Sequence, residues 1–265
     1  MTASWLCAGA LAVLLAILGV WLFRARGELG ALRARLATAT GELERLERAF
    51  ARFVPEGVVE RIIASGIPTV GEKREVTVLF ADLVGFTILS EIVEPVVLVR
   101  ILNGYFERMA RVIQSYHGHI STLTGDGVLA LFGALEPNPW QANDAAHTAL
   151  AMRAELVAYN RELTAEGLPT LAFGIGLHRG NGVAGLVGSH ELLQFTVVGT
   201  IVNVAARVQA LTRDCAVDIL LTHEVQRVLD PRFELRPLPA SELKGVSAPV
   251  ATFALIRHAS GERGA

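Results

Sequence analysis

The sequence predicts an α+β domain that is preceded by a membrane-spanning helix and a coiled-coil helix. Three observations support this: an uncharged apolar run opens the chain, a narrow periodic apolar stripe follows it, and strand and helix patterns alternate from Glu75 onward. Net charge is −2 over 265 residues, which favours neither nucleic acid nor an acidic surface as a partner. The two cysteines form neither a disulfide framework nor a zinc-ligand spacing.

The N-terminal segment, residues 1–23, contains no charged residue. Its apolar run from Trp5 to Phe23 is long enough to cross a bilayer as a helix, which needs roughly 20 residues. A cleaved signal peptide is the alternative, but it would begin with positive charges and have a shorter apolar stretch. Arg24 and Arg26 follow the run, so the positive-inside rule places the rest of the chain in the cytoplasm. We therefore expect a single-pass protein of the inner (plasma) membrane.

The next segment, residues 24–54, carries a single apolar stripe with alternating spacings of three and four residues. The stripe consists of Leu29, Leu32, Leu36, Ala39, Leu43, Leu46, Phe50 and Phe53. This period is typical of a two-stranded coiled-coil seam, and a lone amphipathic helix on the domain or the membrane is the alternative. Gly30 and Gly41 each cost about 1 kcal/mol relative to alanine, so we expect a weak parallel dimer. Residues 55–74 predict a helix from Pro55 to Gly66 and a connector.

Patterns in residues 75–257 predict the elements of the domain in order. They are a strand ending at 82, a helix at 91–116, a hairpin at 119–133, a helix at 142–163, strands at 170–178 and 193–199, a helix at 200–212, a strand at 217–222, a short helix from 224, strands at 232–238 and 250–256, and a tail at 258–265. The opening order of strand, helix, strand, strand, helix, strand is that of a ferredoxin-like sheet with helices on one face.

Two carboxylates stand out in this arrangement. Asp82 ends an apolar strand, where an unmatched negative charge is costly, and Asp126 lies at the tip of the predicted hairpin. Taken alone, Asp126 would be an ordinary turn residue. In a ferredoxin-like sheet, however, the first strand is central, and two carboxylates that meet at its end repel each other unless a cation lies between them. Oxygen ligands without nearby histidine or cysteine favour magnesium or manganese, usually alongside substrate phosphates.

Four segments resemble, in order and spacing, the motif set of the class III nucleotidyl cyclases. They are VLFADLVGFT (78–87), LTGDGVLALFG (123–133), FTVVGTIVNVAARV (195–208) and ELKGVSAPV (242–250). The resemblance covers about Glu75 to Ile256 and implies a cyclase homology domain. It also implies a homodimer whose active sites lie at the subunit interface, with two Mg²⁺ or Mn²⁺ ions per site. Each site would take its metal ligands from one subunit and its substrate-reading residues from the other.

The resemblance further implies roles for individual residues. Asp82 and Asp126 match the two metal-binding aspartates, with the backbone carbonyl of Leu83 as a further ligand. The remaining matches are Thr196 for reading the base, Asn203 for orienting the ribose, Arg207 for stabilising the transition state and Lys244 for gripping the triphosphate. Asn203 and Arg207 are four residues apart on a predicted helix and therefore share one face. The alternative is a solvated face on which Arg207 pairs with an acid.

Two positions bear on which nucleotide is the substrate. Family members that use ATP usually pair a lysine, four residues before the second metal aspartate, with an aspartate or threonine on the other subunit. Thr196 provides the threonine, whereas Thr122 stands at the lysine position and is also not the glutamate of guanylyl cyclases. We expect a membrane-anchored adenylyl cyclase that converts ATP to 3′,5′-cyclic AMP and pyrophosphate. GTP or mixed specificity is one alternative, and a catalytically silent cyclase-like dimeric module is another.

Overall fold

The structure is a computed structural model that describes residues 71–189, 193–243 and 249–259, together with some positions between 21 and 45. The chain divides into two units, Met1–Val54 and Pro55–Ala265. The described positions of the first unit are helical and exposed, among them Leu36 of the predicted seam. Within the described part of the chain, no helix has the length and apolar character to cross a membrane. The predicted span at 1–23 except Trp21, most of the coiled coil and the helix before Gly66 lie outside the described residues, so they stay predictions.

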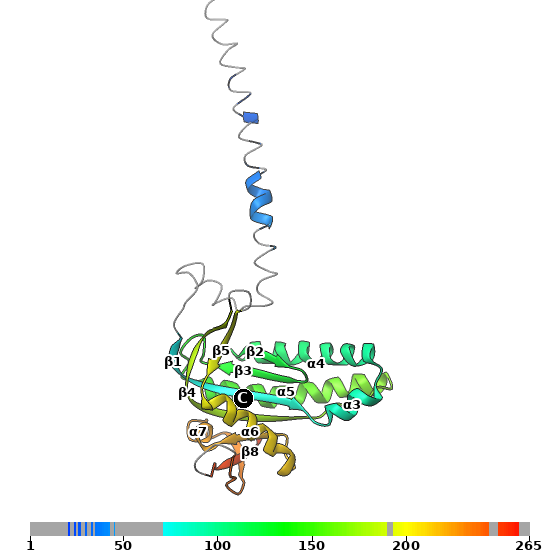
Figure 1. The fold of residues 1–265 in the computed structure, drawn as a ribbon, viewed down its shortest axis with the longest axis vertical. Coiled ribbons are helices and arrows are strands. Elements are labelled where there is room, and N and C mark those ends of the chain that lie inside the picture. The colour runs from blue at the N-terminus through cyan, green and yellow to red at the C-terminus, as the bar shows by residue number, and fades with distance from the viewer. Residues whose placement is uncertain are drawn as a thin grey trace, which may run out of the picture. The chain divides into compact units, whose positions relative to one another are not determined.

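The second unit combines a sheet with helices, as Figure 1 shows. Its described elements are β1 (Glu72–Leu83), α3 (Phe86–Ile92), α4 (Pro95–Ser115), β2 (His119–Thr124), β3 (Gly127–Phe132), α5 (Gln141–Ala165), β4 (Phe173–Gly188), β5 (Leu193–Val198), α6 (Thr200–Asp214), β6 (Ile219–Thr222), α7 (His223–Gln226), β7 (Phe233–Pro237) and β8 (Thr252–His258). The described strands lie in the order β2-β3-β1-β4-β6-β8-β7, and β5 pairs with the outer half of β4.

The first part of the sheet has the predicted ferredoxin-like order. Strands β2, β3, β1 and β4 are neighbours in that order, and each pair is antiparallel. The single helix predicted at 91–116 is wrong at its N-terminal end, because its first residues belong to α3 and α4 begins only at Pro95. Pro95 has no backbone N–H to donate and disfavours a helical conformation at Glu94. The Glu94 side chain instead caps α4 by accepting a hydrogen bond from the Val97 backbone nitrogen at 3.1 Å.

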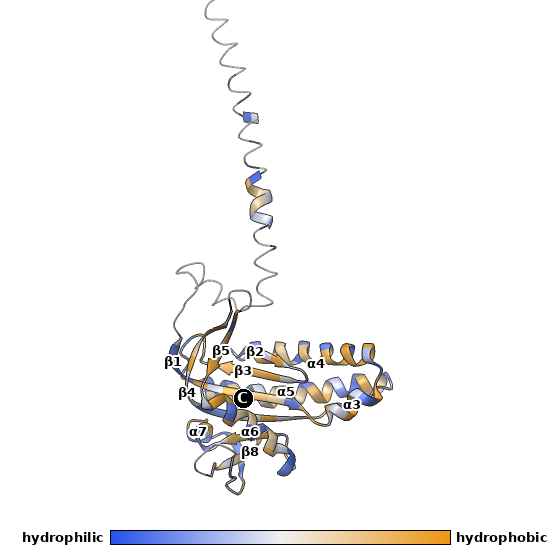
Figure 2. Ribbon diagram, viewed as in Figure 1, coloured by the Kyte–Doolittle hydropathy of each residue, from blue (hydrophilic) through white to orange (hydrophobic). Residues whose placement is uncertain are grey.

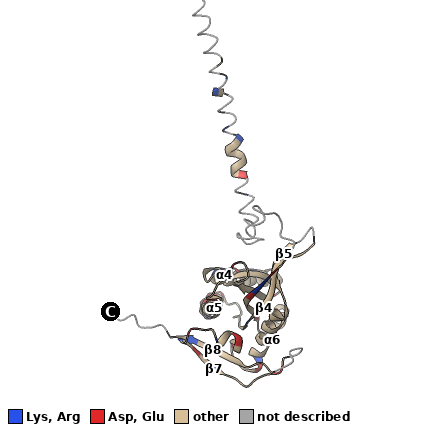
Figure 3. Ribbon diagram, turned by 90° about the vertical axis from the view of Figure 1, so that its left-hand side faces the viewer, with Lys and Arg blue, Asp and Glu red and all other residues tan. Residues whose placement is uncertain are grey.

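Alternation along β1 divides the core into two layers. Leu79, Ala81 and Leu83 belong to the cluster that includes the buried faces of α4 and α5. Val76 and Val78 belong to a second cluster with residues of β5 and α6. Figure 3 shows α4 and α5 on one side of the sheet and α6 on the other, and Figure 2 shows how apolar the strands between them are. By the same alternation, Asp82 lies on the α6 side.

Glycines on β4 determine how closely α6 approaches the sheet. A Cβ atom at Gly176 would lie 2.3 Å from the backbone nitrogen of Gln209 and 2.4 Å from the backbone oxygen of Ala205. A Cβ at Gly174 would lie 2.1 Å from the hydroxyl of Thr212. Only glycine fits where helix backbone rests on strand backbone. The alternating glycines of the predicted strand at 170–178 therefore fix the position of α6, the helix that carries Asn203 and Arg207.

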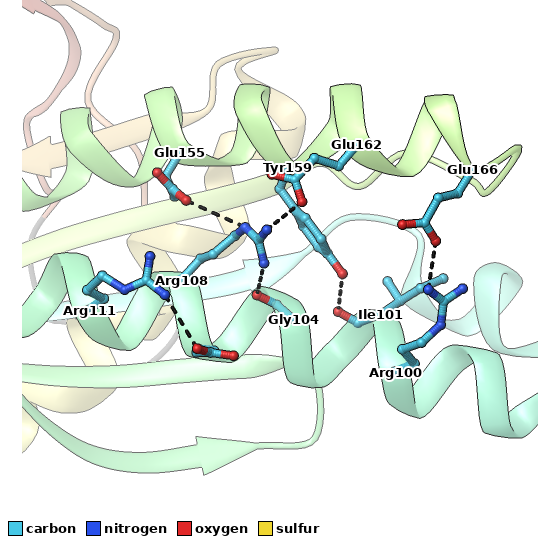
Figure 4. A network of polar contacts seen from close by, with 10 residues as sticks. Arg100, Ile101, Gly104, Arg108, Arg111, Glu155, Tyr159, Glu162 and Glu166 are labelled. Carbon is cyan, nitrogen blue, oxygen red and sulfur yellow. Dashed lines mark hydrogen bonds and ion pairs between the residues drawn. The ribbon is translucent and has the colours of Figure 1, made fainter.

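On the face of the sheet opposite α6, polar contacts join α4 to α5, as Figure 4 shows. The Arg108 guanidinium lies 4.3 Å from the centre of the Tyr159 ring and pairs with the carboxylates of Glu155 and Glu162. The Tyr159 hydroxyl donates a hydrogen bond to the Ile101 carbonyl at 2.9 Å. These contacts join two helices over the face that points away from Asp82, so we assign them to stability.

Candidate functional site

The end of β1 brings Asp82 beside the turn that carries Asp126. Ala81 pairs with Val128 across β1 and β3, so Asp82 is level with the start of β3. A Cβ atom at Gly127 would lie 2.6 Å from the Thr124 hydroxyl and 3.0 Å from Oδ1 of Asp82. The absence of a side chain at position 127 therefore gives the Asp82 carboxylate its room. The structure places the two predicted metal aspartates together, within one chain.

Two carboxylates and one guanidinium meet at the end of β1, and their charges change the pKa of Asp82. Burial raises the pKa of Asp82 above its ordinary value, and the neighbouring Asp126 raises it further through charge repulsion and a shared hydrogen bond. The guanidinium of Arg213 acts in the opposite direction. The buried Tyr105 also responds to both carboxylates: burial chiefly, and then the charges of Asp82 and Asp126, raise the pKa of its phenol.

These donors fit a magnesium or manganese ion. Over the described residues, no group of three or more histidine, cysteine, aspartate or glutamate side chains forms a complete metal cage. Mg²⁺ is commonly bound by one or two carboxylates, with water and substrate phosphates completing its coordination. Asp82 and Asp126 supply that number of carboxylates at a partly exposed strand end. Leu83, the third predicted ligand, has a buried side chain, and only its backbone carbonyl is proposed to contribute.

Arg213 is a residue of this site that the sequence did not indicate. Its Nη2 atom lies 3.4 Å from Oδ2 of Asp82. Arg213 occupies the last turn of α6, far along the chain from β1. Because the contact depends on how α6 crosses the sheet, no local sequence pattern could have predicted it.

Asn203 and Arg207 lie on the face of α6 that points away from the sheet. The buried face of this helix is formed by other residues, namely Ile201, Val204, Ala205, Val208, Gln209 and Thr212. Asn203 is exposed and Arg207 is half-buried, and neither side chain forms a hydrogen bond or ion pair with another described residue. With a rise of about 1.5 Å per residue, Asn203 lies about 15 Å along the helix from Arg213, which contacts Asp82. This spacing separates Asn203 from the carboxylates of its own chain.

The two base-reading positions lie near each other in one chain. Gln194 on β5 donates hydrogen bonds from its side-chain amide to the hydroxyl of Thr122 and to the backbone oxygen of Ser121, both on β2. Thr196 is two residues from Gln194 on the same strand, so both side chains point to the same side. The expectation that Thr122 and Thr196 come from different subunits of one site does not fit this geometry. Gln194 is a second residue that the sequence did not indicate.

The remaining predicted site residue, Lys244, lies outside the described residues. The strand before it ends at Pro237, and Ser241 forms an isolated bridge with Val250 on the far side of the segment. Its assignment to the triphosphate therefore stays a prediction.

Comparison with known proteins shows the family of the domain. The model of the adenylate and guanylate cyclase catalytic domain family matches residues 69–257. The chain belongs to the class III adenylyl and guanylyl cyclase family. An adenylate cyclase of Anabaena cylindrica is 34% identical over 225 residues, which cover 81% of this chain and 44% of the relative. Adenylate cyclase 1 of Rhizobium meliloti is 33% identical over 219 residues, covering 81% of this chain and 33% of the relative. The chain thus spans less than half the length of these curated relatives.

Solved structures of both kinds of cyclase are similar to this domain. The guanylyl cyclase Cya2 aligns with a TM-score of 0.69 and 31% identity, covering 74% of this chain and 98% of that one. The adenylyl cyclase CyaB from P. aeruginosa aligns with a TM-score of 0.66 and 28% identity, covering 70% and 95%. The cyclase fold is therefore common to relatives that are named for different nucleotides.

Proposed function

We propose that this chain is a membrane-anchored adenylyl cyclase that works as a homodimer with two metal ions per active site. The observation that carries the proposal is the separation of Asn203 from the two aspartates within one chain. Asp82 and Asp126 meet at the end of β1, whereas Asn203 lies about 15 Å along α6 from the helix turn that contacts Asp82. A second subunit that presents its α6 face to the carboxylates would complete the site.

The proposed reaction is an in-line displacement within one nucleotide. The ribose 3′-oxygen attacks the α-phosphorus, and the bond from that phosphorus to the pyrophosphate oxygen breaks. Two divalent cations held by Asp82, Asp126 and the Leu83 carbonyl would neutralise the phosphates and lower the pKa of the 3′-hydroxyl. Asn203 would orient the ribose, and Arg207 would donate to the α-phosphate where negative charge increases. Catalysis would then depend mostly on positioning.

ATP is the proposed substrate, and GTP is the second candidate. The two curated relatives reported above are named adenylate cyclases. The motif resemblance also implies that Thr196 is the threonine with which ATP-using family members read the base. The guanylyl cyclase Cya2 and Thr122, which replaces the expected lysine, favour the second candidate. The Thr122 hydroxyl accepts a hydrogen bond from Gln194. Its one hydrogen therefore remains available to donate to a base.

The membrane anchor and the dimer are proposed on separate grounds. The uncharged run before Arg24 supports a single span, with the catalytic domain on the cytoplasmic side. The apolar stripe from Leu29 to Phe53 supports a parallel coil that raises the effective concentration of one catalytic domain near the other.

The test is a direct assay of the full-length chain with ATP or GTP and Mn²⁺, with cyclic nucleotide and pyrophosphate both quantified. We expect cyclic AMP and pyrophosphate in equal amounts, and no product from Asp126→Asn. Formation of cyclic GTP alone would replace ATP by GTP in the proposal. Absence of both products, with the fold intact by circular dichroism, would favour the silent dimeric module.

A further inference from the structure

Arg213 is the one described cation whose side chain contacts the predicted metal carboxylates. Its guanidinium is 3.4 Å from Oδ2 of Asp82, with side-chain exposures of 53% for Arg213 and 26% for Asp82. A cation at this distance occupies space and charge that a metal ion bound to the same oxygen would need. The contact is a side-chain pair at a partly exposed site, so it can break without unfolding the helix.

We propose that Arg213 is a built-in counter-ion that stabilises the metal-free site and leaves Asp82 when the first divalent cation binds. This inference rests on the proposed function, because it takes Asp82 and Asp126 as metal ligands. Without any cation, the two adjacent carboxylates would repel each other. Arg213 reduces that repulsion in the free protein, and its departure becomes part of the cost of metal binding.

The structure gives Arg213 a place to move. A cavity of about 740 Å³ is lined by Arg213 together with Val84, Phe173, Asp218 and Ile256, among others. The cavity thus adjoins the residues directly after Asp82 and the end of α6. The Asp218 carboxylate in this cavity is already paired with Arg153, at 2.5 Å from Nε of Arg153. Arg213 can therefore turn away from Asp82 into solvent-accessible space beside a group of opposite charge.

The position of Arg213 on α6 gives this exchange a consequence for the dimer. The same helix carries Asn203 and Arg207, which the proposed function assigns to the site completed by the partner subunit. Metal binding at Asp82 of one chain would remove the side-chain contact between Arg213 and β1, while the packing of α6 on the glycines of β4 would hold the helix in place. Arg213 is thus a positioning residue that acts through Asp82. Helix α6 then carries both the residue that contacts the chain's own carboxylates and the residues proposed to serve the partner's site.

The test measures binding of Mn²⁺ alone to the full-length chain, by electron paramagnetic resonance of free Mn²⁺ and without nucleotide. Arg213→Gln removes the competing charge, and an exposed pair of this kind contributes enough to predict about a two- to fivefold decrease in the Mn²⁺ Kd. Arg213→Lys keeps a mobile charge and should stay within about twofold of wild type. Arg161→Gln makes the same change of net charge on α5, which covers the other face of the sheet, and should leave the Kd unchanged.

Failure of the Arg213 role and failure of the metal site give different results. If Asp82→Asn abolishes Mn²⁺ binding but Arg213→Gln binds as wild type or more weakly, the counter-ion role is wrong and the metal site stands. If Mn²⁺ binding is absent in wild type or is insensitive to Asp82→Asn, the metal site itself is wrong, and the inference fails with it. A tighter Kd for Arg213→Gln that converges with wild type in 0.5 M salt would support the electrostatic origin of the effect.

Discussion

The side-chain amide of Gln194 on β5 donates a hydrogen bond to the hydroxyl of Thr122 on β2. The Ser121 hydroxyl donates to the Phe195 carbonyl at 3.0 Å, so the same two strands are joined a second time. Strands β2 and β5 are not neighbours in the described sheet. These side chains therefore connect the two positions, 122 and 196, that the family resemblance assigns to the base.

Thr122→Lys should raise the ratio of kcat/KM for ATP over GTP. Threonine is too short to reach the base edge that a lysine would contact, and a lost polar contact typically costs about 0.5–1.5 kcal/mol, up to roughly tenfold in selectivity. The Gln194 amide can turn so that its oxygen accepts from the new ammonium. Initial rates with both nucleotides under matched Mn²⁺ measure the ratio.

The control for this prediction is the double variant Thr122→Lys with Gln194→Leu. It removes the acceptor within the chain and should lose most of the gain. A wild type that already excludes GTP, together with no gain from the lysine, would show that another residue reads the base.

Gly127→Ala should lower turnover at least tenfold. The added Cβ would lie 2.6 Å from the Thr124 hydroxyl, which must move, and 3.0 Å from Oδ1 of Asp82, so the carboxylate must also give by a few tenths of an ångström. Gly125→Ala is the matched control in the same turn, because its Cβ meets no atom within 4 Å although its φ of 64° strains alanine. We expect Gly125→Ala to reduce the free energy of unfolding by about 1 kcal/mol and to retain more turnover. Equal activity losses in both variants would contradict the role given to position 127.

The half-buried His119 should make the domain sensitive to acid. Burial lowers the pKa of His119 to about 4, while a hydrogen bond with the Phe195 backbone acts in the opposite direction. The unfolded chain binds this proton more readily, near pH 6.5. The contribution of neutral His119 is therefore complete above about pH 6.5 and is lost as pH falls toward 4.

Urea unfolding at pH 7 and pH 5 measures this effect. Wild type should lose about 2 kcal/mol more between these pH values than His119→Gln does. His223→Gln removes an exposed histidine and should keep the wild-type difference. If His119→Gln retains the full pH dependence, then the other histidines account for it.

Deletion of residues 27–53 should lower specific activity most at low protein concentration. The active site is proposed to exist only in the dimer, and loss of the coil lowers the effective concentration of the partner domain. A dilution series of wild type and the deletion variant measures this, with analytical ultracentrifugation on the same samples. Specific activity that is independent of both concentration and the coil would count against the dimeric site.

Sequence patterns predicted most of the domain because its elements depend on local rules. The apolar run before Asp82, the helical spacing of Tyr105 and Met109, and the Gly-Asp-Gly turn each specify their element. The break before Pro95 was missed because the apolar spacing continues across it, although proline chemistry disfavours the helix there. The outer half of β4 was missed because its pairing depends on β5, which is remote in the chain.

The site was predictable only in part, because some of its contacts join elements that are remote from each other in the chain. Asp82 and Asp126 could be paired because the strand order of a ferredoxin-like sheet places the hairpin beside β1. The contacts of Arg213 with Asp82 and of Gln194 with Thr122 join elements that are not neighbours in sequence. They follow from the close packing of α6 on glycines of β4 and from the way β5 extends over β2, which a single sequence does not display.

Mixing two inactive variants tests the shared active site most directly. Asp82→Ala removes a metal ligand, and Arg207→Ala removes the group proposed to stabilise the transition state in the partner's site. Each homodimer should be inactive, whereas a heterodimer has one site with both lesions and one intact site. Random pairing at equal concentrations should restore about a quarter of wild-type activity, because half of the dimers would each have one intact site. A mixture that stays inactive, although pull-down through two different tags shows that heterodimers form, would contradict the account.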